Sequence, residues 1–119
     1  MKETNILKET MLEASKLGLV VFRNNVGQLE DKTGRWVQFG LCKGSSDLIG
    51  WMRDTGAFVA IECKAGTAKT RPEQQLFIDM VAKSGGFSCV INDAKKLKTH
   101  LDEYIATRYS DHTTSMKGE

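Results

Sequence analysis

The chain lacks the features that mark membrane proteins, disulfide-rich secreted proteins and zinc-stabilised domains. Its 119 residues contain no apolar run approaching the ~20 residues that a membrane-spanning helix needs, and no signal-peptide core follows the first residues. The three cysteines are odd in number and widely spaced, and they form neither a zinc pattern nor a disulfide framework. We therefore expect no membrane association, and free or buried thiols in a reducing cytoplasm.

The sequence also offers no nucleophile paired with a histidine. The two histidines, His100 and His112, lie toward the C-terminus, and no serine or cysteine is placed to work with them. The content of 40% hydrophobic and 27% charged residues is typical of a soluble globular protein, and the length suits one compact domain. Without a repeat or linker, we assign residues 1–108 to a single domain and expect the polar residues 109–119 to be disordered.

Positive charge is concentrated in one part of the chain. The net charge is only +2, but residues 16–71 hold nine Lys or Arg against five Asp or Glu. Such an excess suits a partner with a phosphate backbone. The alternative is an ordinary mixed surface that water solvates.

Hydrophobic periodicity and turn residues divide the domain into eight elements. In chain order we expect a helix over 4–17, strands over 19–22, 36–39, 48–52 and 57–63, a helix over 71–84, a strand over 87–91 and a helix over 94–107. Strand 19–22 continues toward residue 27, and Thr70 can cap the second helix. This order, α-β-β-β-β-α-β-α, predicts an α/β fold with a mixed β-sheet flanked by helices, in which strand 87–91 lies beside strand 57–63.

The most informative feature is the hairpin formed by strands 48–52 and 57–63. If Met52 pairs with Ala57 across the turn, Asp47 falls directly opposite Glu62. Directly opposed residues have Cβ atoms about 4.5–5.5 Å apart. Because side chains alternate along a strand, Lys64 shares a face with Glu62. The pairing therefore collects two carboxylates and one lysine at one end of the sheet.

Such a cluster suits metal-dependent hydrolysis of a phosphodiester. Two neighbouring carboxylates repel each other unless a cation lies between them or one is protonated. Mg²⁺ prefers a few carboxylate oxygens and lowers the pKa of a water that it holds. Lys64 could position that water or stabilise developing charge on phosphorus. Alternatively, these residues form surface ion pairs without chemistry, as most charged groups do.

These residues resemble a known group of nucleases. Asp47, followed by Glu62-x-Lys64 on a strand, is similar to the motif of the PD-(D/E)xK superfamily. The resemblance is sharper to its VRR-NUC branch, and in particular to small stand-alone members carried by phages and prophages. It runs from about Glu3 to about Tyr104 and rests on segments 23–27, 43–50, 62–64, 72–74 and 85–86.

The resemblance implies a restriction-endonuclease-like fold and a nuclease that uses Mg²⁺ or Mn²⁺. It gives Asp47 and Glu62 the role of metal ligands and Lys64 that of the catalytic lysine, and Gln74 would help to arrange the site. Glu3 would match an acidic residue that joins the metal site, although Glu9 and Glu13 lie on the same expected helix. Ser46 stands where the superfamily often has proline, a variation that the superfamily tolerates.

Stand-alone members of the branch are similar to Holliday-junction resolvases, so the resemblance also implies a homodimer that cuts branched DNA. Two active sites would allow two strands to be cut symmetrically. If the chain is phage-encoded, the bacterial host cytoplasm is the expected location. Phosphate contacts are predicted for residues near the site, with ordinary surface or loop positions as the alternative: Lys43, Ser45, Lys69, Arg71, Arg23 and Asn25. Trp36 and Trp51 are interpreted as packing residues.

We thus expect a divalent-metal-dependent DNA endonuclease. The first alternative is a DNA-structure-binding module that keeps the nuclease fold and cleaves little. The second is a structural protein whose acids pair with nearby lysines. The third is a different hydrolase that uses the same metal site. The endonuclease and the binding module both predict DNA binding, but of these two only the endonuclease predicts efficient cleavage.

Overall fold

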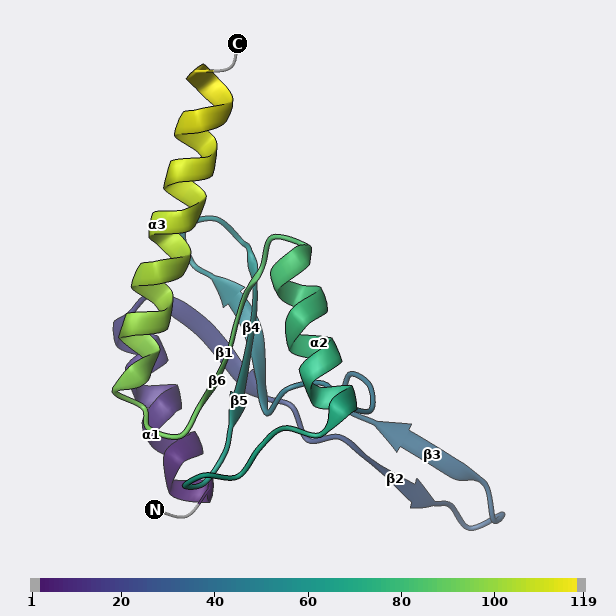
Figure 1. The fold of residues 1–119 in the computed structure, drawn as a ribbon. Coiled ribbons are helices and arrows are strands. Elements are labelled where there is room, and N and C mark those ends of the chain that lie inside the picture. Colours follow the sequence, from purple (N-terminus) through teal and green to yellow (C-terminus); the bar gives the residue numbers. More distant parts are fainter. Residues whose placement is uncertain (1–2, 118–119) are drawn as a thin grey trace.

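The protein is built of three layers. The computed structural model describes the backbone of residues 3–117 and the side chains of residues 5–108. Helices α1 (Glu3–Lys16) and α3 (Lys96–Lys117) lie on one face of a four-stranded sheet, and α2 (Pro72–Lys83) lies on the other (Figure 1). The expected α/β class, with a mixed sheet flanked by helices, is confirmed and is consistent with a restriction-endonuclease-like fold.

The main sheet has the strand order β1-β4-β5-β6, with β1 at Leu19–Arg23, β4 at Leu48–Met52, β5 at Phe58–Cys63 and β6 at Phe87–Ile91. The first three strands in this order are antiparallel, whereas β6 runs parallel to β5, as predicted. Parallel neighbours need a crossover connection, and α2 supplies it. This leaves β1 at one edge of the sheet and α2 over β5 and β6.

The predicted register of the β4–β5 hairpin is confirmed. The N–H of Met52 donates to the carbonyl of Ala57 at 2.8 Å, and Leu48 pairs with Ile61. Extending this register by one position places Asp47 opposite Glu62.

Alternation along these strands sends one set of side chains toward α1 and α3. The largest core cluster combines this set with the inner faces of the two helices; its members include Ile6, Leu48, Val59, Ile61, Cys63, Phe87, Ile91 and Leu97. The other face is also buried where α2 crosses it, since Ala60 packs with Ile78 and Val81. Strand β5 is therefore buried on both faces, as expected of the strand that pairs in parallel with β6.

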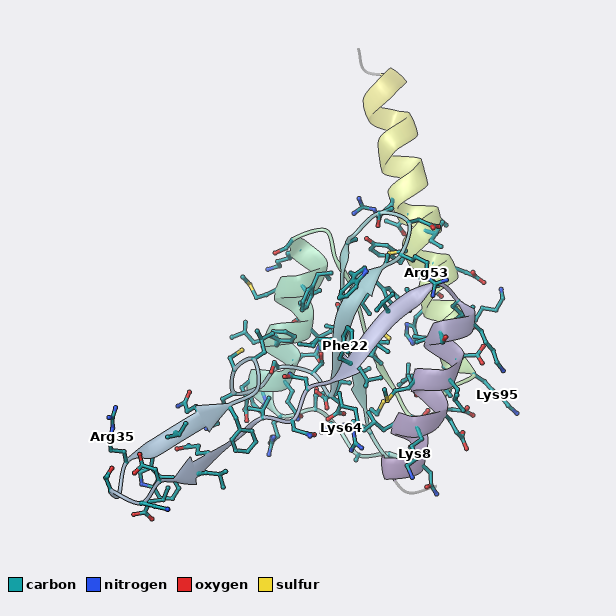
Figure 2. The ribbon with its side chains drawn as sticks, turned by 180° about the vertical axis from the view of Figure 1, so that it is seen from behind. Lys8, Phe22, Arg35, Arg53, Lys64 and Lys95 are labelled. Carbon is teal, nitrogen blue, oxygen red and sulfur yellow. The ribbon has the colours of Figure 1, made fainter. Side chains whose placement is uncertain are left out.

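A separate hairpin is the main departure from the expected order. Instead of continuing to residue 27, β1 ends at Arg23, and β2 (Gly27–Glu30) pairs with β3 (Trp36–Phe39) as a two-stranded sheet of its own. The N–H of Asn24 donates to the carbonyl of Asp47 at 2.8 Å, which continues the β1–β4 register by one position, and the side chain of Asn24 then bonds to Ser45 and Ser46. The hairpin projects from the body of the molecule, with Arg35 at its far end (Figures 1 and 2).

The turn of this hairpin is held by one carboxylate. Asp31 Oδ1 accepts hydrogen bonds from the hydroxyl and N–H of Thr33 and from the N–H of Arg35, at 2.7–2.9 Å. These bonds, led by that of the Thr33 hydroxyl, lower the pKa of Asp31. The turn predicted near this position is thus present, as an aspartate-stabilised turn.

Two helix boundaries differ from expectation. Arg71, not Thr70, precedes the first residue of α2, because the side chain of Gln74 reaches back to the N–H of Arg71. Helix α3 begins at Lys96 instead of residue 94, and Asp93 Oδ1 accepts the N–H of Lys95 just before it. It then continues to Lys117, so the described part of the segment that we expected to be disordered is helical.

The packing role expected of the two tryptophans is wrong for Trp36. Its side chain is 65% exposed, because it lies on the two-stranded hairpin that projects away from the core. Trp51 is 45% exposed and contacts the ring of Phe22 with centroids 5.6 Å apart. Trp51 therefore packs on one side only, at the uncovered end of the main sheet.

Cys42 is exposed, whereas Cys63 and Cys89 are buried. Burial, with a smaller contribution from the neighbouring Cys63, raises the pKa of Cys89 to about 12. We therefore expect one fast-reacting thiol when the folded protein is titrated with a colorimetric disulfide reagent at mildly alkaline pH. The Cys42→Ser variant should lose that fast phase, and denaturant should expose the other two thiols. Equal reaction rates for all three would contradict the burial of Cys63 and Cys89.

Candidate active site

Asp47 and Glu62 face each other at the end of the β4–β5 hairpin, on the sheet face that carries α2. The N–H of Cys63 donates to Asp47 Oδ2 at 2.9 Å, which fixes the aspartate against β5. Among the described residues, nothing donates to Asp47 Oδ1. Glu62 is only 1% exposed. Burying a carboxylate beside a second one is costly unless positive charge or protons compensate it.

Lys64 follows β5 directly, where its N–H donates to the carbonyl of Ile91 at 2.9 Å. The alternation along the strand gives it the same face as Glu62. Its side chain lines a cavity of about 270 Å³ at the ends of β5 and β6, together with Asn92, Lys96 and His100. His100, which seemed remote in the sequence, thus lies beside the same cavity as Lys64.

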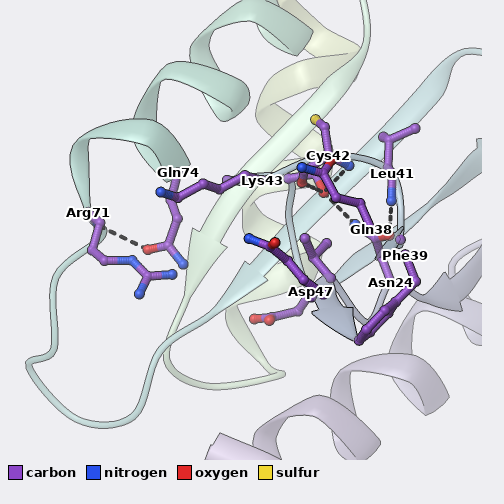
Figure 3. A pocket seen from close by; sticks show the side chains of 15 residues that line it. Asn24, Gln38, Phe39, Leu41, Cys42, Lys43, Asp47, Arg71 and Gln74 are labelled. Carbon is purple, nitrogen blue, oxygen red and sulfur yellow. Dashed lines mark hydrogen bonds between the residues drawn. The ribbon is translucent and has the colours of Figure 1, made fainter. Parts of the chain in front are cut away.

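Asp47 lines a different and larger cavity, of about 380 Å³. Its walls come from the base of the β2–β3 hairpin, the loop over residues 40–45 and the first turn of α2. Figure 3 shows Asp47, Lys43 and Gln74 extending into this opening from three different segments. Asp47 and Lys64 therefore line two different cavities, and Glu62 is buried and lines neither.

The loop that carries Lys43 is held by an asparagine whose role was not predicted. The side-chain amide of Asn24 donates to Ser45 Oγ at 2.7 Å and to the Ser46 carbonyl at 2.9 Å, and its oxygen accepts the N–H of Leu41. The Ser45 hydroxyl donates to the carbonyl of Cys42, and so does the Ser45 N–H. The polar groups of Ser45 are thus used inside the loop, which favours a structural role for this residue over the predicted DNA contact.

Gly44 lets the same loop approach α2 closely. Its φ is +87°, and a Cβ at this position would lie 2.8 Å from the carbonyl oxygen of Glu73. Any side chain would therefore push the loop away from the helix. This contact brings Lys43 next to the start of α2.

Gln74 is buried at 7% exposure and faces the cavity from the first turn of α2. Its Oε1 accepts the N–H of Arg71 at 2.9 Å, so one hydrogen bond both caps the helix and orients the side chain. Gln74 thus lines the same cavity as Asp47, and it also has a structural function.

The predicted phosphate contacts divide into two groups. Lys43 and Arg71 are exposed and line the cavity that contains Asp47. Arg71 also forms an ion pair with Glu73, with 3.3 Å between Nε and Oε1. Lys69 is exposed in the loop before α2, whereas Arg23 and Asn25 are exposed at the end of β1. These last three residues are not among those that line the cavity.

The residues fit a divalent cation that keeps most of its own water. Within the described part of the chain, no three His, Cys, Asp or Glu side chains are grouped to hold a metal. Mg²⁺ and Mn²⁺ need no such cage, because one or two carboxylates together with substrate phosphate suffice. The side chain of Glu3 lies outside the described residues. Glu9 and Glu13 are carried by α1, which covers the opposite face of the sheet from Asp47.

Sequence reasoning missed the contribution of the projecting hairpin. Gln28 and Gln38 are direct partners in the β2–β3 register, so they share a face, and both line the cavity with Asp47. The opposite face carries Leu29, Val37 and Phe39, which are exposed. Alternating polar and apolar residues on both sides of a turn were the available signal, but the position of the hairpin depends on Asn24.

A mixed sheet with helices on both faces is consistent with the class of restriction-endonuclease-like domains. Comparison with known families gives the more specific result, because the VRR-NUC domain model matches residues 2–94. The chain belongs to the VRR-NUC family, a nuclease family of the PD-(D/E)xK superfamily. A search among curated proteins found no match. No helix in the described part of the chain is long and apolar enough to cross a membrane.

The helix-capping function of Gln74 can be measured separately from any role in catalysis. We expect Gln74→Ala to lower the free energy of unfolding by about 1 kcal/mol, because the N–H of Arg71 loses its acceptor. Gln75→Ala is the matched control: its side chain is exposed, and the loss should be at most about 0.5 kcal/mol. Urea unfolding checks both values. Equal losses in the two variants would argue against the capping bond.

Proposed function

We propose that this VRR-NUC protein is a metal-dependent DNA endonuclease that hydrolyses phosphodiester bonds with Mg²⁺ or Mn²⁺. The observation that carries the proposal is the confirmed hairpin register, which places Asp47 opposite Glu62 on the face that Lys64 shares. In a nuclease family, a carboxylate pair followed by a lysine is the set of groups that phosphodiester hydrolysis needs.

Each residue has a task that follows from its position. Asp47 and Glu62 would hold the cation, and the bond from Cys63 N–H to Asp47 Oδ2 keeps one carboxylate in a fixed orientation. When bound, the cation supplies Lewis-acid stabilisation of phosphate charge and a lower pKa for water. Lys64 would orient the attacking water or donate to a non-bridging phosphate oxygen. Gln74, anchored by its bond to Arg71, would order the same space from α2.

The surroundings of the site suit a nucleic-acid strand. Lys43 and Arg71 lie on the side of Asp47, and Lys96 lies on the side of Lys64. A strand that crosses the site would meet cationic side chains before and after the cleaved bond. Lys69 and Arg23, both exposed, would contact phosphates further away.

The finer parts of the proposal follow from the family resemblance. We propose that the substrate is branched DNA such as a Holliday junction, and that the protein acts as a homodimer so that two strands are cut. If the chain is phage-encoded, we propose the cytoplasm of the bacterial host as its location. A DNA-structure-binding module with little cleavage is the alternative, and the exposed lysines and arginines at the two cavities would serve it equally well.

Cleavage of labelled four-way junction, flap and duplex DNA decides between these possibilities. We expect nicks with Mg²⁺ or Mn²⁺ and none with EDTA. Asp47→Asn and Lys64→Ala should each lower the rate by about a hundredfold or more, because each removes a group that acts on the developing charge. Lys83→Ala, at the other end of α2, should cleave like the wild type. Binding without cleavage in any metal would favour the binding module.

Metal binding has a second measurement that does not depend on cleavage. At a Mn²⁺ concentration ten times the dissociation constant, the wild type should gain about 1.4 kcal/mol of stability. Asp47→Asn should gain much less. A similar gain in both proteins would place the cation elsewhere.

Lys43 tests the electrostatic part of the proposal. Replacing one lysine that contacts a phosphate should reduce the slope of log affinity against log salt concentration by about 0.9 on duplex DNA. We therefore expect Lys43→Ala to bind DNA more weakly and with a shallower salt dependence. Lys98→Ala is the control, since Lys98 pairs with Asp102 on α3. An unchanged slope in Lys43→Ala would remove Lys43 from the interface.

A further inference from the structure

The sheet face that carries the Asp47–Glu62 pair is only half covered. Helix α2 lies over β5 and β6, and among the described residues no helix lies over β1 and β4 on this side. The side chains that point to this side are apolar, and several are exposed. We call the following set the sheet–α2 patch, with exposed fractions in parentheses: Phe22 (53%), Trp51 (45%), Phe58 (39%), Leu76 (63%) and Met80 (53%).

The patch is continuous from the edge strand to the helix. The ring centroids of Phe22, which is labelled in Figure 2, and Trp51 are 5.6 Å apart. Trp51 in turn pairs with Phe58 in the β4–β5 register. Phe58 and Met80 line one cavity of about 300 Å³ between β5 and α2. Leu76 and Met80 lie one turn apart on α2, so they share a side of the helix. The patch is therefore one surface with a hollow that can receive an apolar side chain.

The area of the patch matches what one side of a dimer interface needs. If aromatic side chains contribute about 150–250 Å² each and the aliphatic ones slightly less, the exposed part of the patch is on the order of 450 Å². A standard interface buries about 800 Å² per partner, of which roughly two thirds is apolar in homodimers. The patch thus supplies most of the apolar area that a stable pair requires.

The charge of the patch favours a second copy over nucleic acid. The residues that β1, β4 and β5 direct to this side before Glu62 are Val20, Phe22, Ile49, Trp51, Phe58 and Ala60, and none is charged. DNA binding depends on Lys and Arg, which the strand part of this surface does not offer. An uncharged surface can meet an identical one across a twofold axis without repulsion, as a symmetric dimer requires.

We propose that the sheet–α2 patch is the surface through which two copies of this chain associate. The functional value of this dimer rests on the proposed function, in which Asp47 and Glu62 are catalytic. These two residues lie on the same sheet face as the patch, at the end of the β4–β5 hairpin. Association through this face brings the two catalytic pairs into one assembly. Each protomer keeps its own complete site.

The test is the mass of the protein in solution, measured by sedimentation equilibrium. The wild type should form a species of twice the 13.2 kDa chain mass. Trp51→Glu and Phe22→Glu place like charges across the twofold axis, and each should weaken association by about thirtyfold or more, as the loss of an interface hot spot does. Both residues are about half exposed, and circular dichroism with thermal unfolding checks that each variant folds.

Two controls carry the same change elsewhere. Leu12→Glu alters a side chain that is 67% exposed on α1, on the opposite side of the sheet, and should remain dimeric. Val37→Glu alters the exposed apolar face of the β2–β3 hairpin and should also remain dimeric. Dissociation by Val37→Glu while Trp51→Glu and Phe22→Glu stay dimeric would overturn the proposal in favour of the hairpin. A monomeric wild type at all concentrations would overturn it altogether.

The same variants separate this proposal from the proposed nuclease activity. Monomeric Trp51→Glu should still nick one strand at a time with added metal, because Asp47, Glu62 and Lys64 are unchanged. It should lose the paired cuts in two strands of a four-way junction. A wild type that dimerises through the patch but never cleaves would contradict the nuclease and leave the interface established. If the wild type cleaves DNA but Trp51→Glu and Phe22→Glu both remain dimeric, only the proposed interface would be contradicted.

Discussion

The antiparallel register between β4 and β5 is the constraint on which the rest of the molecule depends. It is set at the turn, where the N–H of Met52 bonds to the carbonyl of Ala57, and it is held at the far end by the bond from Cys63 N–H to Asp47 Oδ2. A slip by one residue would move every side chain of one strand to the other face. The slip would separate Asp47 from Glu62 and would expose core residues at the same time. The stability of the core and the geometry of the site are therefore specified by one set of backbone hydrogen bonds.

One sheet face serves three purposes along its length. At one end it presents the carboxylate pair, in its middle Ala60 is buried under α2 while Phe22 is exposed on the edge strand, and at the other end it presents Trp51 and Phe58. The opposite face is covered by α1 and α3 and forms the main core. Because α2 covers only part of its face, the uncovered ends are available for substrate and for the second copy that we propose.

Local rules predicted what local interactions decide. The turn residues and apolar runs around Met52 and Ala57 were sufficient for the register. The departures occur where a distant partner decides. The side chain of Asn24, directly after β1, bonds to Ser45 and Ser46 more than twenty positions away, and these bonds hold the loop beside the projecting hairpin. No property of the residues around Asn24 indicates those partners.

The sequence by itself determined the fold class, the order of most elements and the pairing of Asp47 with Glu62, because hydrophobic alternation and a short turn act within a few residues. The tertiary structure alone decided which residues surround that pair. It placed Gln28 and Gln38 on the wall of one cavity and His100 beside Lys64 in the other, and it left half of a sheet face uncovered. These arrangements depend on how the hairpin and the helices dock, and docking sums many weak contacts between segments that are far apart in the chain.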